Sequence, residues 1–96
     1  MFTITDVKIR KIINDGGNLK AIISITVDNC LAIHDIKVVQ GNDRLFVAMP
    51  SRKDESGIFR DIVHPIDSAA RNEFENEILT AYENYIKVAE ILDNED

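Results

Sequence analysis

Four basic side chains in the second half of the sequence are candidates for binding an anion. Arg52 and Lys53 are adjacent in a charged loop, and Arg60 alternates with Phe59 on the apolar segment that follows. Arg71 comes at the start of a helical pattern, where the helix dipole disfavours a cation, so we expect a partner anion nearby. Guanidinium and ammonium groups bind phosphate. Alternatively, Arg52 and Lys53 are solvated charges that keep an edge strand soluble, and the residue types leave both interpretations open.

Acidic neighbours offer a competing role for Arg60. It can form an ion pair with Asp54 or Glu55, which lie in the same loop region. Exposed ion pairs contribute only about 0–1 kcal/mol, so such a pair would not explain the placement of this arginine well.

The remaining polar residues are not typical of a catalytic or metal site. His34 and His64 are the two histidines, and their spacing from other possible ligands is not that of a zinc site. We expect His34 to be a hydrogen-bonded structural residue, and His64, just before Pro65, to orient the corner before the helix. A nucleophile–base signature, a glycine-rich phosphate loop and paired cysteines are all missing from the sequence. The sequence therefore predicts no catalytic residue, no metal and no cofactor, and a protein that is not an enzyme.

Length and composition predict one domain in a reducing compartment. The chain has 96 residues, enough for one modest core. No apolar run approaches the roughly 20 residues that span a bilayer, and the N-terminus is unlike a signal peptide. The single cysteine, Cys30, cannot form an internal disulfide, and we expect it to be buried as a small hydrophobe. These features predict a cytoplasmic location and no membrane span.

The charge is distributed unevenly along the chain. The net charge is −6, which argues against general nucleic-acid binding. Residues 1–66, however, hold nine Lys or Arg against eight Asp or Glu, whereas residues 67–96 hold two against nine. The acidity is therefore concentrated in the C-terminal third, and a local basic patch remains possible elsewhere.

The first two thirds of the sequence predict an antiparallel sheet. Apolar and polar residues alternate, as in half-buried strands, and Gly- and Asn-containing turns separate the segments about every ten residues. A bulge near His34 and Asp35 would explain an irregular register in the third segment. The last two strands form a hairpin and are closed by Pro50 and Pro65, because proline cannot donate to a sheet ladder. We expect strands at residues 5–10, 19–27, 30–39, 45–49 and 58–64.

A single long helix is predicted over residues 67–92, followed by a frayed acidic tail at 93–96. Asp67 or Ser68 is the expected N-cap, and apolar residues then recur at steps of three or four. Tyr82 and Tyr85 have core spacing. A helix of about 25 residues reaches roughly 37 Å, whereas a six-residue strand spans around 20 Å, so the helix should overhang the sheet.

The sequence thus predicts an α+β domain, a five-stranded antiparallel meander with one C-terminal helix. We expect it to be a homodimer that uses a strand edge or the helix.

Two blocks in the middle of the sequence carry a resemblance to a known family. Phe46–Ser51 reads Phe-Val-Ala-Met-Pro-Ser, and Phe59–Ile66 reads Phe-Arg-Asp-Ile-Val-His-Pro-Ile. Together with the segments 5–10, 20–26 and 33–38, they resemble the bacterial SpoVG family, the stage V sporulation protein G or septation regulator. The resemblance runs from about Thr5 to the helix start near Arg71.

The resemblance implies a small cytoplasmic dimer with an antiparallel sheet and a C-terminal helix. It implies a regulator that binds DNA, and in some members RNA, and that affects septum formation and sporulation. Family members commonly have Ser-Lys-Arg where this chain has Ser51-Arg52-Lys53, and Arg60 and Arg71 match basic positions of the family. The resemblance therefore makes these four cations the expected nucleic-acid-binding residues. The alternative is a protein-interaction module of the septation machinery, with protein partners and no direct nucleic-acid contact.

Overall fold

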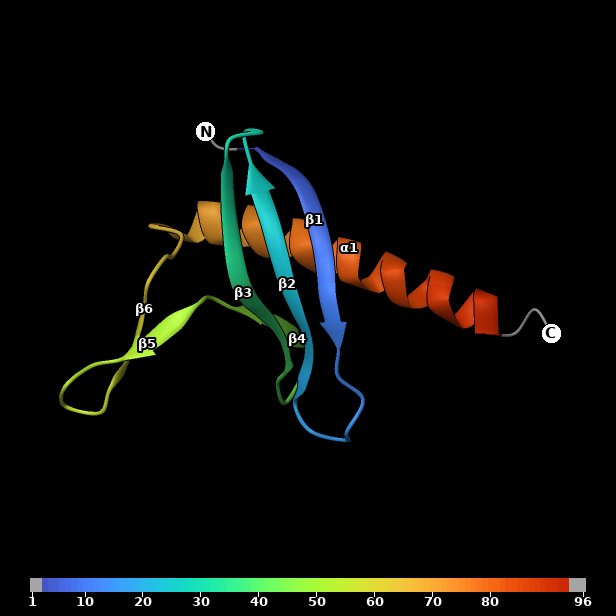
Figure 1. The fold of residues 1–96 in the computed structure, drawn as a ribbon, viewed down its shortest axis with the longest axis horizontal. Coiled ribbons are helices and arrows are strands. Elements are labelled where there is room, and N and C mark those ends of the chain that lie inside the picture. Colours follow the sequence, from blue (N-terminus) through green and yellow to red (C-terminus); the bar gives the residue numbers. More distant parts are fainter. Residues whose placement is uncertain (1–2, 94–96) are drawn as a thin grey trace.

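A four-stranded antiparallel sheet forms the centre of the molecule in the computed structural model, which describes residues 3–93 (Figure 1). The strands follow one another in the sheet in chain order. They are β1 (Ile4–Ile12), β2 (Leu19–Val27), β3 (Leu31–Gln40) and β4 (Leu45–Ala48). A separate two-stranded hairpin, β5 (Ser51–Lys53) and β6 (Phe59–Asp61), precedes the helix α1 (Ser68–Asp93). The α+β class and the single C-terminal helix are confirmed.

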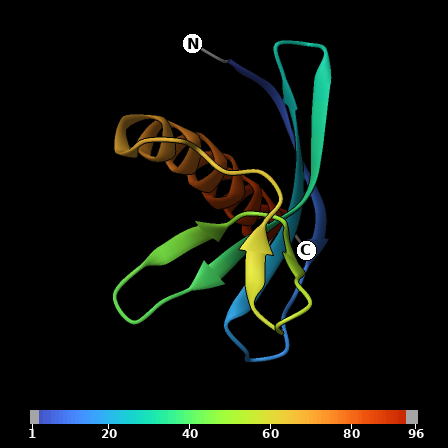
Figure 2. The ribbon, with the colours of Figure 1, turned by 90° about the vertical axis from the view of Figure 1, so that its left-hand side faces the viewer.

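The predicted five-stranded meander is wrong in its last part. The strand expected at 45–49 is β4, which ends at Ala48, and Ser51–Lys53, expected in the loop, forms the separate strand β5. Pro50 has no N–H to continue the ladder, and its carbonyl instead accepts a hydrogen bond from the Ile62 N–H at 2.8 Å. The chain therefore leaves the main sheet, and β5 pairs with β6 alone. In Figures 1 and 2 this hairpin projects to one side of the sheet.

The expected bulge in the third strand is confirmed. Ile23 pairs with Ile36 and Ile25 pairs with Ile33, so β3 advances three residues where β2 advances two. Asp35 lies in the bulge with a φ of 62°, a left-handed conformation that Asp tolerates better than most residues. The bulge places His34 and Asp35 opposite Ser24.

The turn between β2 and β3 is where predicted, but its cysteine is not buried. Asp28 and Asn29 both have positive φ, as a tight reversal requires. Cys30 follows them at the tip of the turn and is exposed. The expectation of a buried Cys30 was wrong because the turn takes three residues rather than two, which leaves Cys30 outside the strand.

One face of the sheet packs on α1 and forms the core. The buried positions alternate along β2, because successive side chains point to opposite faces. Figures 1 and 2 show α1 on this face, with no helix over the other. The buried apolar residues are Ala21, Ile23, Ile25, Val27, Ile36, Val38, Val47, Met49, Phe74 and Ile78. We call the opposite face, turned away from α1, the outer face.

The helix begins at an Asp67 cap and extends past the sheet. The Asp67 carboxylate accepts a hydrogen bond from the Ala70 N–H at 2.8 Å, which satisfies one of the free donors of the first turn.

Tyr82 packs against the core, and burial raises the pKa of its phenol. Tyr85 is 47% exposed, so its predicted core position is wrong within one copy of the chain. Val88, Ile91 and Leu92 are also exposed, on the end of α1 that overhangs the strands (Figure 1).

Two further expectations concern membranes and the chain end. Within residues 3–93, no helix is both long and apolar enough to cross a bilayer. Of the tail that was expected to fray, Asp93 is the last residue of α1 and 94–96 lie outside the described residues.

Candidate nucleic-acid interface

The β5–β6 hairpin brings three of the four predicted cations together. Arg52 pairs directly with Arg60 across the hairpin, and Lys53 pairs with Phe59. Paired residues share a face and successive residues alternate, so the two arginines lie on one face and Lys53 on the other. The Lys53 Nζ lies 5.8 Å from the centre of the Phe59 ring, within reach of a cation–π contact. All four side chains are exposed.

Asp54 organises the loop of this hairpin. One carboxylate oxygen accepts hydrogen bonds from the Ser56 N–H, the Ser56 hydroxyl and the Ile58 N–H, at 2.9, 2.8 and 3.0 Å. The other oxygen accepts from the Arg60 Nε at 2.7 Å. Gly57, with a φ of 85°, completes the turn. The Arg60 guanidinium, followed by the Ser56 hydroxyl and the Ile58 N–H, lowers the pKa of Asp54 to about 2.

The lowered pKa predicts how the hairpin responds to acid. Because the pKa of the folded Asp54 lies below the ordinary aspartate value of 3.8, its charged form stabilises the hairpin above about pH 4. This contribution is lost as the pH falls through about 2. An NMR titration should give a midpoint near 2 for the Asp54 carboxyl, and Arg60→Gln should move it up towards 3.8, because the arginine is the largest cause of the shift. A midpoint unchanged by Arg60→Gln would show that this arginine is not bound to Asp54 in solution.

Arg71 lies beside the hairpin rather than on it. Arg60 and Arg71 line one open hollow together with Phe59, Asp61 and His64. The expected partner anion of Arg71 is Glu75, one turn along α1, with Nη1 and Oε1 3.4 Å apart. Glu75 is only 8% exposed and also lies 3.8 Å from Arg44. Arg71 is therefore part of a small ion-pair cluster at the edge of the hollow.

Arg52 and Lys53 remain unpaired by acids. Among residues 3–93, the ion pairs of Arg60 and Arg71 involve Asp54 and Glu75, and none involves Arg52 or Lys53. Both line an open hollow that Arg60 also borders, together with the acids Asp54, Glu55 and Asp61. Arg60 lines both neighbouring hollows, so the four predicted cations lie around two adjoining hollows in which acids are interspersed.

The two histidines have structural contacts. The His34 Nδ1 and the Ser24 hydroxyl share a hydrogen bond of 2.8 Å, as expected for a hydrogen-bonded residue. The His64 Nδ1 lies 3.0 Å from the Pro65 carbonyl oxygen, on the segment that joins β6 to α1. In the described part of the chain, no group of three or more His, Cys, Asp or Glu side chains is placed to hold a metal ion.

A second group of cations was not included in the predicted site. Lys8, Arg10 and Lys11 on β1, and Lys37 on β3, belong to the outer face of the sheet by their register. The alternation of polar and apolar residues in 5–10 already places Lys8 and Arg10 away from the core. The register that brings Lys37 beside them depends on two bulges and cannot be read from the local pattern.

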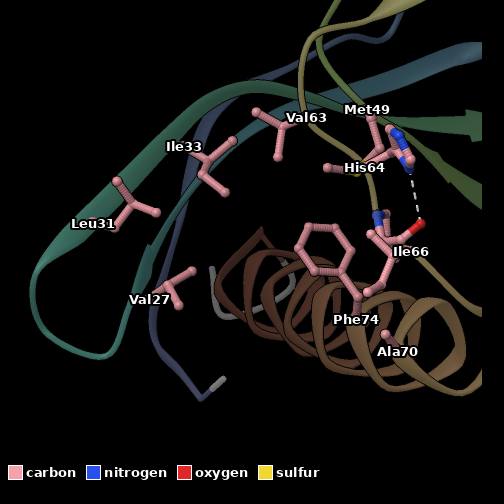
Figure 3. Close-up of a pocket in the computed structure, with 10 residues that line it drawn as sticks. Val27, Leu31, Ile33, Met49, Val63, His64, Ile66, Ala70 and Phe74 are labelled. Atoms are coloured by element: carbon pink, nitrogen blue, oxygen red, sulfur yellow. Dashed lines mark hydrogen bonds between the residues drawn. The ribbon is translucent and has the colours of Figure 1, made fainter. Parts of the chain in front are cut away.

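An apolar cavity of about 240 Å³ lies between β3, the segment 63–66 and the start of α1 (Figure 3). Leu31 and Ile33 border it from β3, Phe74 from α1, and Val63 and Ile66 from the segment before the helix. Its exposed apolar rim could contact another protein, and it offers little to a charged ligand.

Comparisons with known proteins agree on one family. The SpoVG family model matches residues 2–84, which cover most of the chain and end inside α1. A protein of Desulforudis audaxviator is 54% identical over 81 residues, 84% of this chain and 91% of its own length. A protein of Caldicellulosiruptor bescii is 48% identical over 87 residues, 91% and 98% of the two chains. One of Clostridium botulinum is 51% identical over 88 residues, 92% and 96%. All three carry the name "Putative septation protein SpoVG".

Proposed function

The chain belongs to the SpoVG family of septation proteins, and from this premise we propose that it is a cytoplasmic regulator that binds nucleic acid. Its ligand is DNA, and also RNA, and its effect is on septum formation and sporulation. The observation that carries the proposal is the pair Arg52 and Lys53, exposed on a projecting hairpin and without an acidic partner in residues 3–93 (Figure 1). Cations that no protein carboxylate neutralises are available to phosphate.

The four cations have different roles in this proposal. Arg52 and Lys53 make the primary phosphate contacts from the two faces of the hairpin. Arg60 is held in place by Asp54 through its Nε, and its two terminal nitrogens keep their donors for a second phosphate. Arg71 adds a partly neutralised charge at the far side of the adjoining hollow.

A filter-binding titration with duplex DNA and with RNA, at two salt concentrations, tests the hairpin. We expect Arg52→Ala plus Lys53→Ala to lower the affinity for duplex DNA and to reduce its salt slope by about 2 for each hairpin that contacts the duplex, because each phosphate neutralised contributes about 0.9 to the slope. Lys87→Ala, which removes an exposed cation from α1, is the matched control and should bind as the unaltered protein does. Equal affinity of the double variant and the unaltered protein would remove Arg52 and Lys53 from the site.

We also propose that the functional unit is a homodimer. The overhanging end of α1 exposes apolar side chains next to the free edge of β1, and a groove runs between the two. Apolar surface of this kind is stabilised when a second copy covers it. The exposed side chains are Tyr85, Val88, Ile91 and Leu92. A symmetric pair would present two hairpins, and therefore two copies of each cation, to one nucleic acid.

Exposed apolar residues support a second candidate, a protein-interaction module of the septation machinery. Phe59 and Ile62 are exposed on and beside the hairpin, and Ile66 is 88% exposed at the rim of the apolar cavity. Such side chains fit a protein surface better than a phosphate backbone. The same titration separates the candidates, since the absence of binding to DNA and RNA at low salt would favour the protein-interaction function.

A further inference from the structure

We propose that the outer face of the four-stranded sheet is a second nucleic-acid surface, which binds single strands through Lys8, Arg10, Lys11 and Lys37. This surface shares its class of ligand with the proposed function, but it lies on the sheet and not on the hairpin. Either surface can therefore fail without the other. In Figure 1 the outer face is the one turned to the viewer, in front of α1.

Strand register brings these cations into two adjacent rows. Lys8 pairs with Ser24, whereas Lys11 pairs with Ile22, which in turn pairs with Lys37. Neighbouring strands are about 4.8 Å apart, so Lys11 and Lys37 start about 10 Å from each other across β2, and successive rows are about 7 Å apart. The register shift between Ile9 and Lys11 adds Arg10 between the rows. The result is a cluster of four positive charges over three strands.

Hydrogen bonds across the strands hold the centre of this cluster. The Arg10 Nε donates to the Ser24 hydroxyl at 3.2 Å, and the same hydroxyl is bonded to the His34 Nδ1 at 2.8 Å. Ser24 is only 5% exposed although it is on the outer face, which is consistent with Arg10 and His34 lying over it. Arg10 keeps the donors of its two terminal nitrogens, since only its Nε takes part. The arginine is thus fixed in position before any ligand binds.

Within the described part of one copy of the chain, the charges of this cluster are not paired with acids, and Lys8 and Arg10 also line the groove beside α1 that the proposed homodimer would cover. Among residues 3–93, Lys8, Arg10, Lys11 and Lys37 form no ion pair with an acid, whereas Arg44, Arg60 and Arg71 all do. Two acids lie next to these rows by register: Asp35, in the bulge, and Asp6, which pairs with Thr26 in the row beyond Lys8. The glutamates of α1 belong to an element on the other side of the sheet. A polyanion would therefore meet a net positive surface here, and a net negative one on the side of the helix.

The shape of the outer face favours a single strand over a duplex. Neither α1 nor the hairpin lies on this face in Figures 1 and 2, so no element projects there that could enter a groove of a duplex. Two rings border the cations: His34, held by Ser24, and Phe46, which pairs with Val39 and is 37% exposed. Unpaired bases stack on exposed aromatic side chains of a sheet while cations follow the backbone. This combination fits splayed bases better than paired ones.

Fluorescence anisotropy with a labelled 12-nucleotide oligothymidylate, and with a duplex of equal length, tests the proposal. We expect Lys8→Gln plus Lys11→Gln plus Lys37→Gln to weaken single-strand binding by about tenfold or more at low salt. The salt slope should fall by about 2, since each phosphate on a single strand contributes about 0.7. Phe46→Leu should weaken the same binding by about fivefold and leave the slope unchanged, because it removes stacking and not charge.

Three controls make the result specific. Circular dichroism and thermal unfolding establish that each variant is folded, and Lys87→Gln, an exposed cation on α1, should leave single-strand binding unchanged. Arg52→Ala plus Lys53→Ala should retain most of the single-strand binding, even if duplex binding is lost. The proposal is overturned if the folded triple variant binds the oligothymidylate as well as the unaltered protein. It is equally overturned if only the hairpin variant loses single-strand binding.

Discussion

Replacement of Ile36 by alanine lowers the free energy of unfolding by about 2–5 kcal/mol, the largest stability effect that we expect from a single substitution here. Ile36 is 0% exposed and lies on β3 beside Ile23, in the cluster that includes Ile78 of α1. Its truncation leaves a cavity between the sheet and the helix, because the surrounding side chains relax only partially into the vacated space. Domains of this size are stable by only about 5–15 kcal/mol, so the variant would lose a large part of its stability.

Urea unfolding followed by circular dichroism measures this change, and Ile66→Ala is the matched control. The control removes the same atoms from a side chain that is 88% exposed, so its effect should stay within about 0.5 kcal/mol. If the two variants were equally destabilised, Ile66 would have to be buried in the protein as it exists in solution. Such a result would contradict the exposed rim of the apolar cavity.

The largest effect on assembly is expected from Val88→Asp plus Ile91→Asp. Both side chains are exposed on the overhanging end of α1, and in the proposed homodimer they are covered by the second copy. Burial of a carboxylate costs several kcal/mol unless it is paired, and of the two positions only Val88 lies in the groove that Lys8 and Arg10 also line. The dissociation constant of the dimer should therefore rise by about a hundredfold or more.

Sedimentation velocity at several protein concentrations follows this change from dimer to monomer. Asn76→Asp plus Thr80→Asp adds the same two charges at exposed polar positions of α1 and should leave the dimer intact. A monomer of the unaltered protein at all concentrations would contradict the homodimer itself. A dimer of the Val88→Asp plus Ile91→Asp variant would move the interface away from the helix end.

Local patterns predicted the elements that local forces determine. The span Leu19–Val27 was predicted to the residue because apolar residues alternate along it, with Ile22 as the one exception, and Gly16 and Asp28 lie in turns at either end. The bulge at His34 and Asp35 was predicted because the apolar register of the third strand, residues 30–39, is irregular at that point. The cap at Asp67 follows from a side-chain oxygen just before an amphipathic segment.

Pairing between distant segments was harder to predict. The pattern of 45–53 predicted a strand closed by Pro50 and a charged loop after it, and it did not show that Ser51–Lys53 forms a strand that pairs with Phe59–Asp61 alone. Asp54 was one of the two partners expected for Arg60. The sequence could not show that the Asp54 carboxylate accepts hydrogen bonds from the loop and from Arg60 at the same time. The sequence contains the cations of the outer face, but it does not show that they lie side by side. Their grouping depends on the register across three strands.

The separation of the sheet cations from the acidic helix has a consequence for encounter rates. With the helix on one side of the sheet only, and with more acids than cations in α1, we expect a dipole moment directed between the helix and the outer face of the sheet. A distant polyanion exerts a torque on such a dipole and turns the sheet towards itself before contact. A larger fraction of collisions then occurs in the productive orientation, which raises the association rate constant at low salt. This rate constant should decline steeply as added salt shortens the range of the field.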